Sequence, residues 1–110
     1  MANILVAKLK KMIDEYDQTH FMGTDFSGLD LSGFNFSGMT FGKADFSQTK
    51  LYKTKFCKAF MEECNFKGAD LPYADLSEAK LKKSNFTWSN LIGADLNRAD
   101  LNSANFPGPV

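Results

Sequence analysis

Large apolar residues occur at every fifth position of the chain from residue 21 to residue 106. We call these eighteen residues centres; nine are Phe, eight are Leu and one is Met. They are Phe21, Phe26, Leu31, Phe36, Phe41, Phe46, Leu51, Phe56, Met61, Phe66, Leu71, Leu76, Leu81, Phe86, Leu91, Leu96, Leu101 and Phe106. Neither an α-helix, with about 3.6 residues per turn, nor a strand, in which alternate residues share a face, brings every fifth residue to one side. The pattern predicts a chain that coils around an axis, with one short side per repeat and every centre pointing inward.

The positions before each centre carry a second pattern. Two residues before the centre, eight of the eighteen residues are Ala, four are Thr, two are Ser and one is Cys64. The exceptions, Leu29, Phe34 and Met39, all belong to the first coil, where we expect a wider core to meet a cap. One residue before the centre, twelve of the eighteen are Asp or Asn. The small residue is therefore expected to point inward beside the centre, and the Asp or Asn to point outward.

The identities of the centres indicate how many repeats complete a coil. Residues twenty apart form an uninterrupted Phe series from Phe26 to Phe106 and an uninterrupted Leu series from Leu31 to Leu91. The other two series change from Phe to Leu along the chain. Since identical side chains recur after twenty residues, we expect four repeats per coil and a square cross-section. The coils should stack about 4.8 Å apart, as neighbouring strands do.

With these consecutive repeats, residues 19 to 108 resemble the pentapeptide-repeat family. The resemblance implies an all-β fold, a right-handed quadrilateral β-helix with four pentapeptides per coil, and the handedness is taken from the family alone. At four repeats per coil, eighteen repeats give about four and a half coils. The predicted domains are an N-terminal capping helix in residues 1–18 and a β-solenoid in residues 19–110.

Both ends of a solenoid expose core and unpaired backbone, so each end needs cover. A helical pattern in residues 4–17 places Ile4, Leu5, Leu9, Met12, Ile13 and Tyr16 on one face. We expect this α-helical cap to cover the first coil; contact of Lys8, Lys10 and Lys11 with a membrane surface is the alternative. The chain finishes in Pro107, Gly108, Pro109 and Val110. Either these prolines blunt the C-terminal edge, or a second copy packs against it to form a homodimer.

Glycines mark the first corners of the solenoid. Gly23, Gly28, Gly33 and Gly38 each follow a centre by two residues. A type II turn needs a positive φ at its third residue, which Gly adopts without steric cost, so we expect type II turns here. Later corners carry Lys, Glu, Tyr or Trp at this position, which leaves another turn type open. The seven Asp residues before centres are expected to bond to nearby backbone rather than to form a catalytic array.

The sequence contains no recognisable catalytic or metal-binding set. The one His, His20, lies beside the predicted cap, while Cys57 should point outward and Cys64 inward, which argues against a disulfide or a zinc site. Thirteen basic and thirteen acidic residues cancel, which argues against binding to nucleic acid or an acidic membrane. We find no signal peptide and no apolar run long enough to span a membrane. We therefore expect a cytoplasmic protein that is not an enzyme and has no cofactor, metal or small-molecule substrate.

Exposed apolar residues and lysines are each concentrated on part of the predicted surface. Tyr52, Pro72 and Ile92 fall in one outward column, Tyr73 adjoins it, and Trp88 lies at the preceding corner. A contiguous exposed patch with Trp and Tyr indicates an interface, so these five are the candidate binding residues; the alternative is that the rings only stiffen this side. The second feature is a set of lysines, for which phosphate contact is the alternative to a solvated face. The set comprises Lys43, Lys50, Lys53, Lys55 and Lys58. Separately, Phe60 is expected to point outward on another side of the coil.

Two functions follow from these observations. The first is a non-enzymatic scaffold that presents a rigid surface to a protein partner of unknown identity. The alternative, implied by the family resemblance, is a DNA mimic that modulates DNA gyrase or topoisomerase. That mimicry needs a long and strongly negative surface, whereas this chain is short and neutral. The sequence therefore favours the scaffold.

Overall fold

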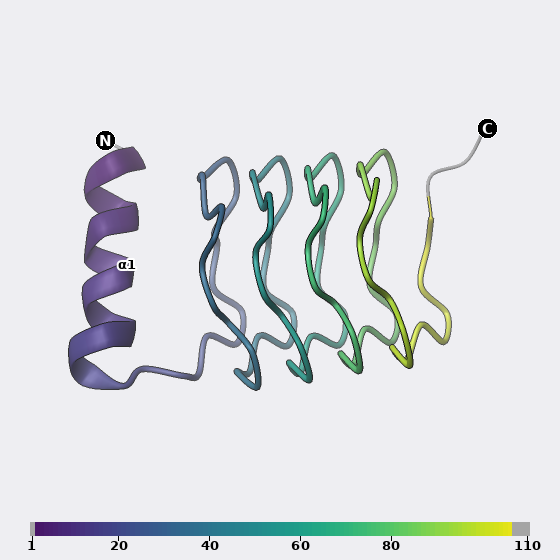
Figure 1. The fold of residues 1–110 in the computed structure, drawn as a ribbon, viewed down its shortest axis with the longest axis horizontal. Helices are drawn as coiled ribbons and strands as arrows, with labels where there is room; N and C mark the ends of the chain where they lie inside the picture. The colour runs from purple at the N-terminus through teal and green to yellow at the C-terminus, as the bar shows by residue number, and fades with distance from the viewer. Residues whose placement is uncertain (1, 107–110) are drawn as a thin grey trace.

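The computed structural model describes residues 2–106, which form one α-helix followed by a β-solenoid (Figure 1). Helix α1 spans Ala2–Tyr16 and lies across one end of the stack of coils. The molecule is elongated, with extents of 40 × 25 × 23 Å, and the coils follow one another along its long axis. The proline-containing segment expected to blunt the C-terminal edge, residues 107–110, lies outside the described residues.

Backbone hydrogen bonds join each coil to the next. Fourteen parallel bridges connect residues twenty apart, from His20 and Thr40 to Asn85 and Asn105. The N–H of each centre from Phe21 to Phe86 also donates to a carbonyl in the next coil, as from Phe26 to Asp45 over 2.7 Å. Each repeat contributes one bridged residue, so the sides of the coil are too short for longer strands in the described part of the chain. The register of twenty residues is the one that the Phe and Leu series predicted.

Every described corner uses the same backbone conformation. The second residue after each centre from 21 to 101 has a positive φ, between 56° and 77°. The next N–H then donates back to the carbonyl of the centre, as from Ala44 to Phe41 over 2.8 Å. Glycine occupies only six of these corners, and residues such as Lys58 and Trp88 adopt a φ of 62°. The positive φ expected at the first corners therefore continues along the solenoid, although a left-handed residue other than Gly costs roughly 1–2 kcal/mol.

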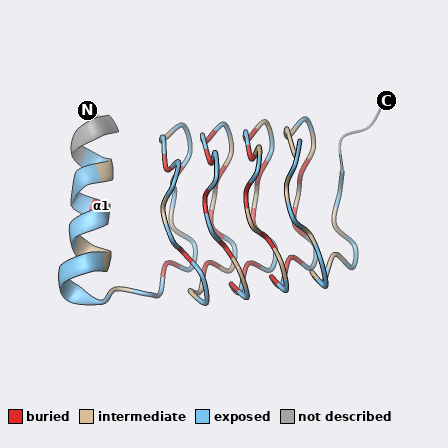
Figure 2. Cartoon of the chain, viewed as in Figure 1, coloured by how far each residue is buried: buried red, intermediate tan, exposed pale blue. Residues whose placement is uncertain are grey.

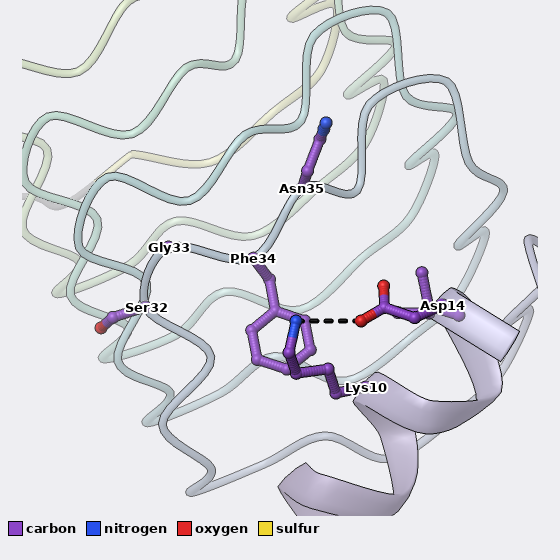
Figure 3. A pocket seen from close by; sticks show the side chains of 7 residues that line it. Lys10, Asp14, Ser32, Gly33, Phe34 and Asn35 are labelled. Atoms are coloured by element: carbon purple, nitrogen blue, oxygen red, sulfur yellow. Dashed lines mark ion pairs between the residues drawn. The ribbon is translucent and has the colours of Figure 1, made fainter.

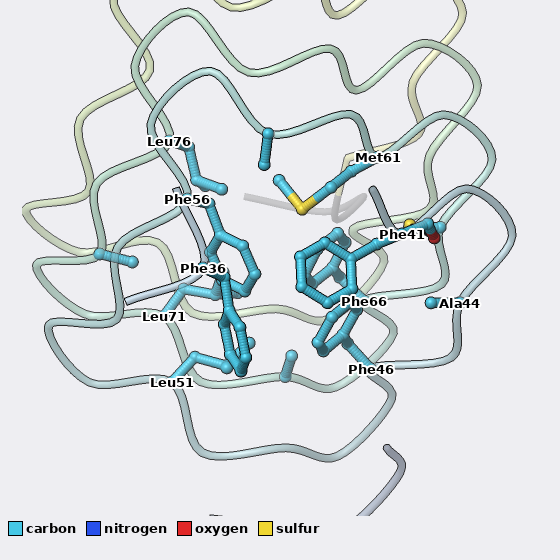
Figure 4. Packing of buried hydrophobic residues seen from close by; sticks show 14 of the residues in the cluster. Phe36, Phe41, Ala44, Phe46, Leu51, Phe56, Met61, Phe66, Leu71 and Leu76 are labelled. Atoms are coloured by element: carbon cyan, nitrogen blue, oxygen red, sulfur yellow. Dashed lines mark hydrogen bonds between the residues drawn. The ribbon is translucent and has the colours of Figure 1, made fainter. Parts of the chain in front are cut away.

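Stacked centres fill the axis of the solenoid (Figure 4). The Phe series forms a ladder in which successive ring centroids lie 5.0, 5.0, 4.8 and 5.3 Å apart and the last three pairs are within 6° of parallel. Neighbouring series meet edge to face, as Phe46 and Phe56 do at 5.5 Å and 84°. Figure 2 shows that buried residues recur through the first four coils, whereas most of α1 and all of the last coil are exposed or intermediate. In the last coil Leu91, Leu96 and Leu101 are only partly buried, and Phe106 is 41% exposed.

Helix α1 covers the first coil through a narrower face than the sequence predicted. Leu9 is buried, and Val6, Met12 and Ile13 are partly buried against the core. The prediction that Leu5 and Tyr16 belong to this face is wrong, because they are 56% and 70% exposed. Leu5 borders an open groove beside the helix, and Tyr16 is the last helical residue, beyond the turn that contacts the coil. The side chain of Ile4, predicted on the same face, lies outside the described residues.

The bulky residues of the first coil lie where the wider core was expected. Leu29, Phe34 and Met39 occupy positions that later coils fill with small side chains, and all three are partly buried against the core. Phe34 points from the coil toward α1 (Figure 3). These side chains extend the apolar interior toward the helix.

Candidate functional site: the aromatic side of the solenoid

The predicted outward column is present as a continuous series of backbone hydrogen bonds. The N–H of Gly33 donates to the carbonyl of Tyr52 over 2.9 Å, and the N–H of Tyr52 donates to the side-chain hydroxyl of Ser32 over 3.3 Å. The N–H of Lys53 donates to the carbonyl of Pro72 over 3.1 Å, and that of Tyr73 to the carbonyl of Ile92 over 2.9 Å. These bonds hold Tyr52, Pro72 and Ile92 in successive coils at one corner. The backbone positions from which their side chains project are therefore fixed along the axis.

Tyr73 is held between two neighbours in this corner. Its ring meets that of Tyr52 edge to face, with centroids 6.1 Å apart. On its other side it lies over Gly93, where a Cβ would be 2.5 Å from Cδ1 of Tyr73. Gly93 also has a φ of +70°, so both the backbone and the tyrosine favour glycine there. The Lys53 ammonium lies 5.3 Å from the centroid of Tyr52, within range of a cation–π contact.

Trp88 lies on the neighbouring corner and is less constrained. It is 63% exposed, and its ring does not pair with any other aromatic ring within residues 2–106. Between Trp88 and Ile92, the Asn90 side-chain oxygen accepts the Ile92 N–H over 3.1 Å. The structure thus brings Tyr52 and Tyr73 into contact and places Ile92, 66% exposed, and Trp88 on adjoining corners of the same side. Pro72 is half-buried in the column.

Two lysines of the second coil, Lys50 and Lys55, lie beside carboxylate residues of neighbouring coils. Lys50 forms bridges with Asp30 on one side and Asp70 on the other, and Lys55 forms a bridge with Asp75. Opposite charges directly across neighbouring strands are favourable. The side-chain hydroxyl and N–H of Ser32, with a smaller effect from the Lys50 ammonium, lower the pKa of Asp30. Within residues 2–106, the ion pairs no longer than 4.0 Å are both on α1, so the solenoid charges alternate without close pairing.

Most of the Asp side chains before centres are engaged in local structure. Asp25, Asp45, Asp75 and Asp100 each accept the N–H of the residue two positions later, at 2.8–3.1 Å. Asp30 and Asp95 do the same. This confirms the predicted bonding to nearby backbone for six of the seven. At His20, which is exposed, Nδ1 lies 3.0 Å from the Thr19 hydroxyl.

The two cysteines occupy the predicted inside and outside positions. Both are free thiols; Cys57 is partly exposed and Cys64 is buried. The Cys64 thiol donates to the carbonyl of Phe41, and burial raises its pKa to about 12. A buried thiol with such a pKa remains protonated and is a poor nucleophile.

Two features of the surface were not recognised from the sequence. The first is a notch of about 210 Å³ between Met22 and Phe60, which are 65% and 46% exposed. It lies at Gly42, where a Cβ would be 3.3 Å from the Met22 terminal methyl, and no positive φ requires glycine there. Only the twenty-residue register, which stacks Met22 and Gly42, could have indicated it. The second is a cleft beside α1, formed by segments that are distant in sequence.

Residues 2–106 contain neither a metal-binding cluster nor a membrane-spanning helix. Within residues 2–106, no three His, Cys, Asp or Glu side chains are grouped so that they could hold a metal ion. Helix α1 is not long and apolar enough to cross a membrane, and residues 2–106 contain no other helix.

Comparison with protein families identifies the repeat. A family model described as pentapeptide repeats, in eight copies, matches residues 19–57, 44–82 and 79–108. Comparison with curated proteins gives no match.

Solved structures with a similar fold include two pentapeptide repeat proteins. One is HetL, a pentapeptide repeat protein involved in heterocyst differentiation regulation in the cyanobacterium Nostoc sp. strain PCC 7120, with 28% identity and a TM-score of 0.80. The other is a pentapeptide repeat protein from the thylakoid lumen of Arabidopsis thaliana, with 32% identity and a TM-score of 0.59. Each alignment covers 83% of this chain, but only 42% of HetL and 57% of the Arabidopsis protein. The chain thus spans less than two thirds of either relative.

Proposed function

We propose, from the premise that this chain belongs to the pentapeptide-repeat family, that it is a non-enzymatic scaffold that presents a rigid side surface to a protein partner. In this proposal the solenoid is a right-handed, four-sided β-helix of about four and a half coils, and the protein acts in the cytoplasm. The contact residues are Tyr52, Pro72, Tyr73, Trp88 and Ile92. Solenoids commonly bind partners through such extended surfaces.

The observation that carries the proposal is the fixed position of Tyr73. Its ring is exposed by 57%, yet it contacts Tyr52 on one side and Gly93 on the other. A ring that is ordered before binding loses little conformational entropy when a partner covers it, and Tyr and Trp are enriched among residues that dominate binding energy. Tyr73 is therefore the proposed anchor, and the more freely exposed Trp88 a second contact.

We do not favour the alternative of a DNA mimic. Such a surface would need carboxylates in an unbroken series along the axis, whereas the series through Asp30, Lys50 and Asp70 alternates in sign. The absence of an effect of excess protein on gyrase supercoiling is the result expected from this reasoning.

The proposal can be tested by site-specific photo-crosslinking of the full chain in cells of its source organism. A photoreactive phenylalanine analogue at position 88 reports on the aromatic side. The same analogue at position 83 is a matched control, because Lys83 is also exposed, lies one repeat away and has a φ of 61° against 62° for Trp88. A partner on the aromatic side should give a crosslinked band from position 88 and none from position 83.

The band should also depend on the proposed anchor. Tyr73→Glu, combined with the probe at position 88, should abolish the crosslink without changing the far-UV circular dichroism of the purified chain. Equal bands from positions 83 and 88, or a band that survives Tyr73→Glu, would contradict the assignment of this surface.

A further inference from the structure

A cleft of about 390 Å³ separates α1 from the first coil on one side of the helix (Figure 3). It is lined by Lys10, Ile13 and Asp14 of α1 and by residues 32–35 of the first coil. Its size falls within the roughly 300–1,000 Å³ typical of small-molecule sites. The cleft brings together segments about twenty residues apart in sequence, which is why no local motif indicates it.

The cleft exists because a single helix cannot cover the end of the solenoid. A helix with its side chains is about 10–12 Å across, whereas the molecule measures 25 × 23 Å across its long axis. The margin beside the helix stays open at Gly33, which has no atom within 4 Å of the position that a Cβ would take. A groove on the opposite flank of α1, bordered by Leu5, Leu9 and Leu29, is smaller at about 180 Å³.

The apolar wall of the cleft is a fixed aromatic ring. Phe34 is only partly buried, and its ring stacks on that of Phe36 at a centroid distance of 5.3 Å and an angle of 23°. The partly buried Ile13 faces the same space from α1. A flat ring that enters the cleft can therefore pack against Phe34 without first ordering it.

The charged wall of the cleft is an ion pair. The Lys10 ammonium lies 3.0 Å from the Asp14 carboxylate, and their side chains are 68% and 55% exposed. Exposed pairs of this kind contribute little to stability, so a ligand can separate them at small cost. A ligand with one charge would satisfy Lys10 or Asp14 and oppose the other, whereas a zwitterion can pair with both.

We propose that this cleft binds a small zwitterion with an aromatic ring, the chemical class of the aromatic amino acids. The ring packs against Phe34 and Ile13, the carboxylate pairs with Lys10, and the ammonium pairs with Asp14. The site uses none of the five proposed contact residues of the aromatic side, so it does not rest on the scaffold proposal; Ser32, whose hydroxyl accepts the Tyr52 N–H, borders both surfaces.

Three probes that share the phenyl ring and differ in their charged groups test this proposal on the isotope-labelled full chain. L-phenylalanine carries both charges, 3-phenylpropionate lacks the ammonium, and 2-phenylethylamine lacks the carboxylate. Amide shifts in residues 32–35 should report binding of L-phenylalanine with a Kd on the order of 1 mM. Each singly charged probe should bind about two- to fivefold more weakly, the range expected for loss of one exposed ion pair.

A second lysine on the same helix provides the matched control. Lys11 also faces an acid four residues later, with its ammonium 4.0 Å from Glu15, but it does not line the cleft. Lys10→Ala should remove the preference for L-phenylalanine over 2-phenylethylamine, and Lys11→Ala should leave it unchanged. Equal affinity for the three probes, equal effects of the two substitutions, or no shift of residues 32–35 at 20 mM probe would overturn the proposal.

Discussion

The Phe ladder predicts very different roles for the same residue in the middle and at the end of the stack. Phe66 is fully buried, with parallel rings above and below it at 5.0 Å and 4.8 Å. Replacement of a core Phe by Ala typically costs 3–5 kcal/mol, about 4 kcal/mol here because both ring faces lose a partner. Among the aromatic rings of residues 2–106, Phe106 stacks on Phe86 alone, at 5.3 Å, and it is 41% exposed, so Phe106→Ala should cost about 1–2 kcal/mol.

Urea unfolding followed by far-UV circular dichroism would measure both losses. Phe66→Leu is a useful third variant, because Leu fills the equivalent centre in neighbouring series; it should cost less than about 1.5 kcal/mol. Since a solenoid contacts only its neighbouring repeats, Trp88 fluorescence should be recorded in parallel to verify that unfolding is two-state. Equal losses for Phe66→Ala and Phe106→Ala would refute the reasoning, because they would show that stacking on both faces adds nothing.

Three further predictions follow from the cap, the corners and the core. Leu9→Ala should lower the free energy of unfolding by about 2–3 kcal/mol and Leu5→Ala by less than about 0.5 kcal/mol, because only Leu9 is buried. If urea unfolding showed the larger loss for Leu5→Ala, the packing of α1 would be contradicted. Gly28→Ala should cost roughly 1–2 kcal/mol for its positive φ alone, and Gly93→Ala measurably more, because its Cβ would collide with Tyr73; equal midpoints would show that the tyrosine does not rest there. The pKa of Cys64 is about 12 in the folded chain against an ordinary 9.0, so the stability that the protonated thiol confers should fall as pH rises from about 9 toward 12. The free energy of unfolding should therefore be lower at pH 10 than at pH 8, and the part of this difference that is due to the thiol should be absent in Cys64→Ala.

The regular part of the fold could be predicted because each repeat has the same pattern of inward-facing and outward-facing positions. Phe26 and Phe46 share a series, and the structure joins the Asp residues before them by a bridge. Helix α1 was harder, because a helical pattern identifies an apolar stripe but not how much of it rests on a partner. Leu5 carries the same signal as Leu9, and only the placement of α1 on the first coil, which buries Leu9 and leaves Leu5 exposed, separates them.

Features that depend on contacts between coils were the least predictable. The non-glycine corners, such as Lys58, adopt a φ that local preference disfavours, because bonds to neighbouring coils hold them there. The contact of Tyr73 with Gly93 is visible in the sequence only after the twenty-residue register is known. The cleft needs both the register and the placement of α1, so Lys10 and Phe34 could not be paired in advance.

The stacked register gives insertions and deletions two distinct geometric outcomes. Bridges link residues twenty apart, and rings in successive coils are separated by about 5 Å. An insertion of twenty residues would therefore shift everything beyond it along the axis by one such step, with its direction unchanged. An insertion of five would instead turn the remainder of the surface to the next side. Chain length thus acts as a ruler in this architecture, and evolution can adjust the distance between two surface groups separately from the direction in which they point.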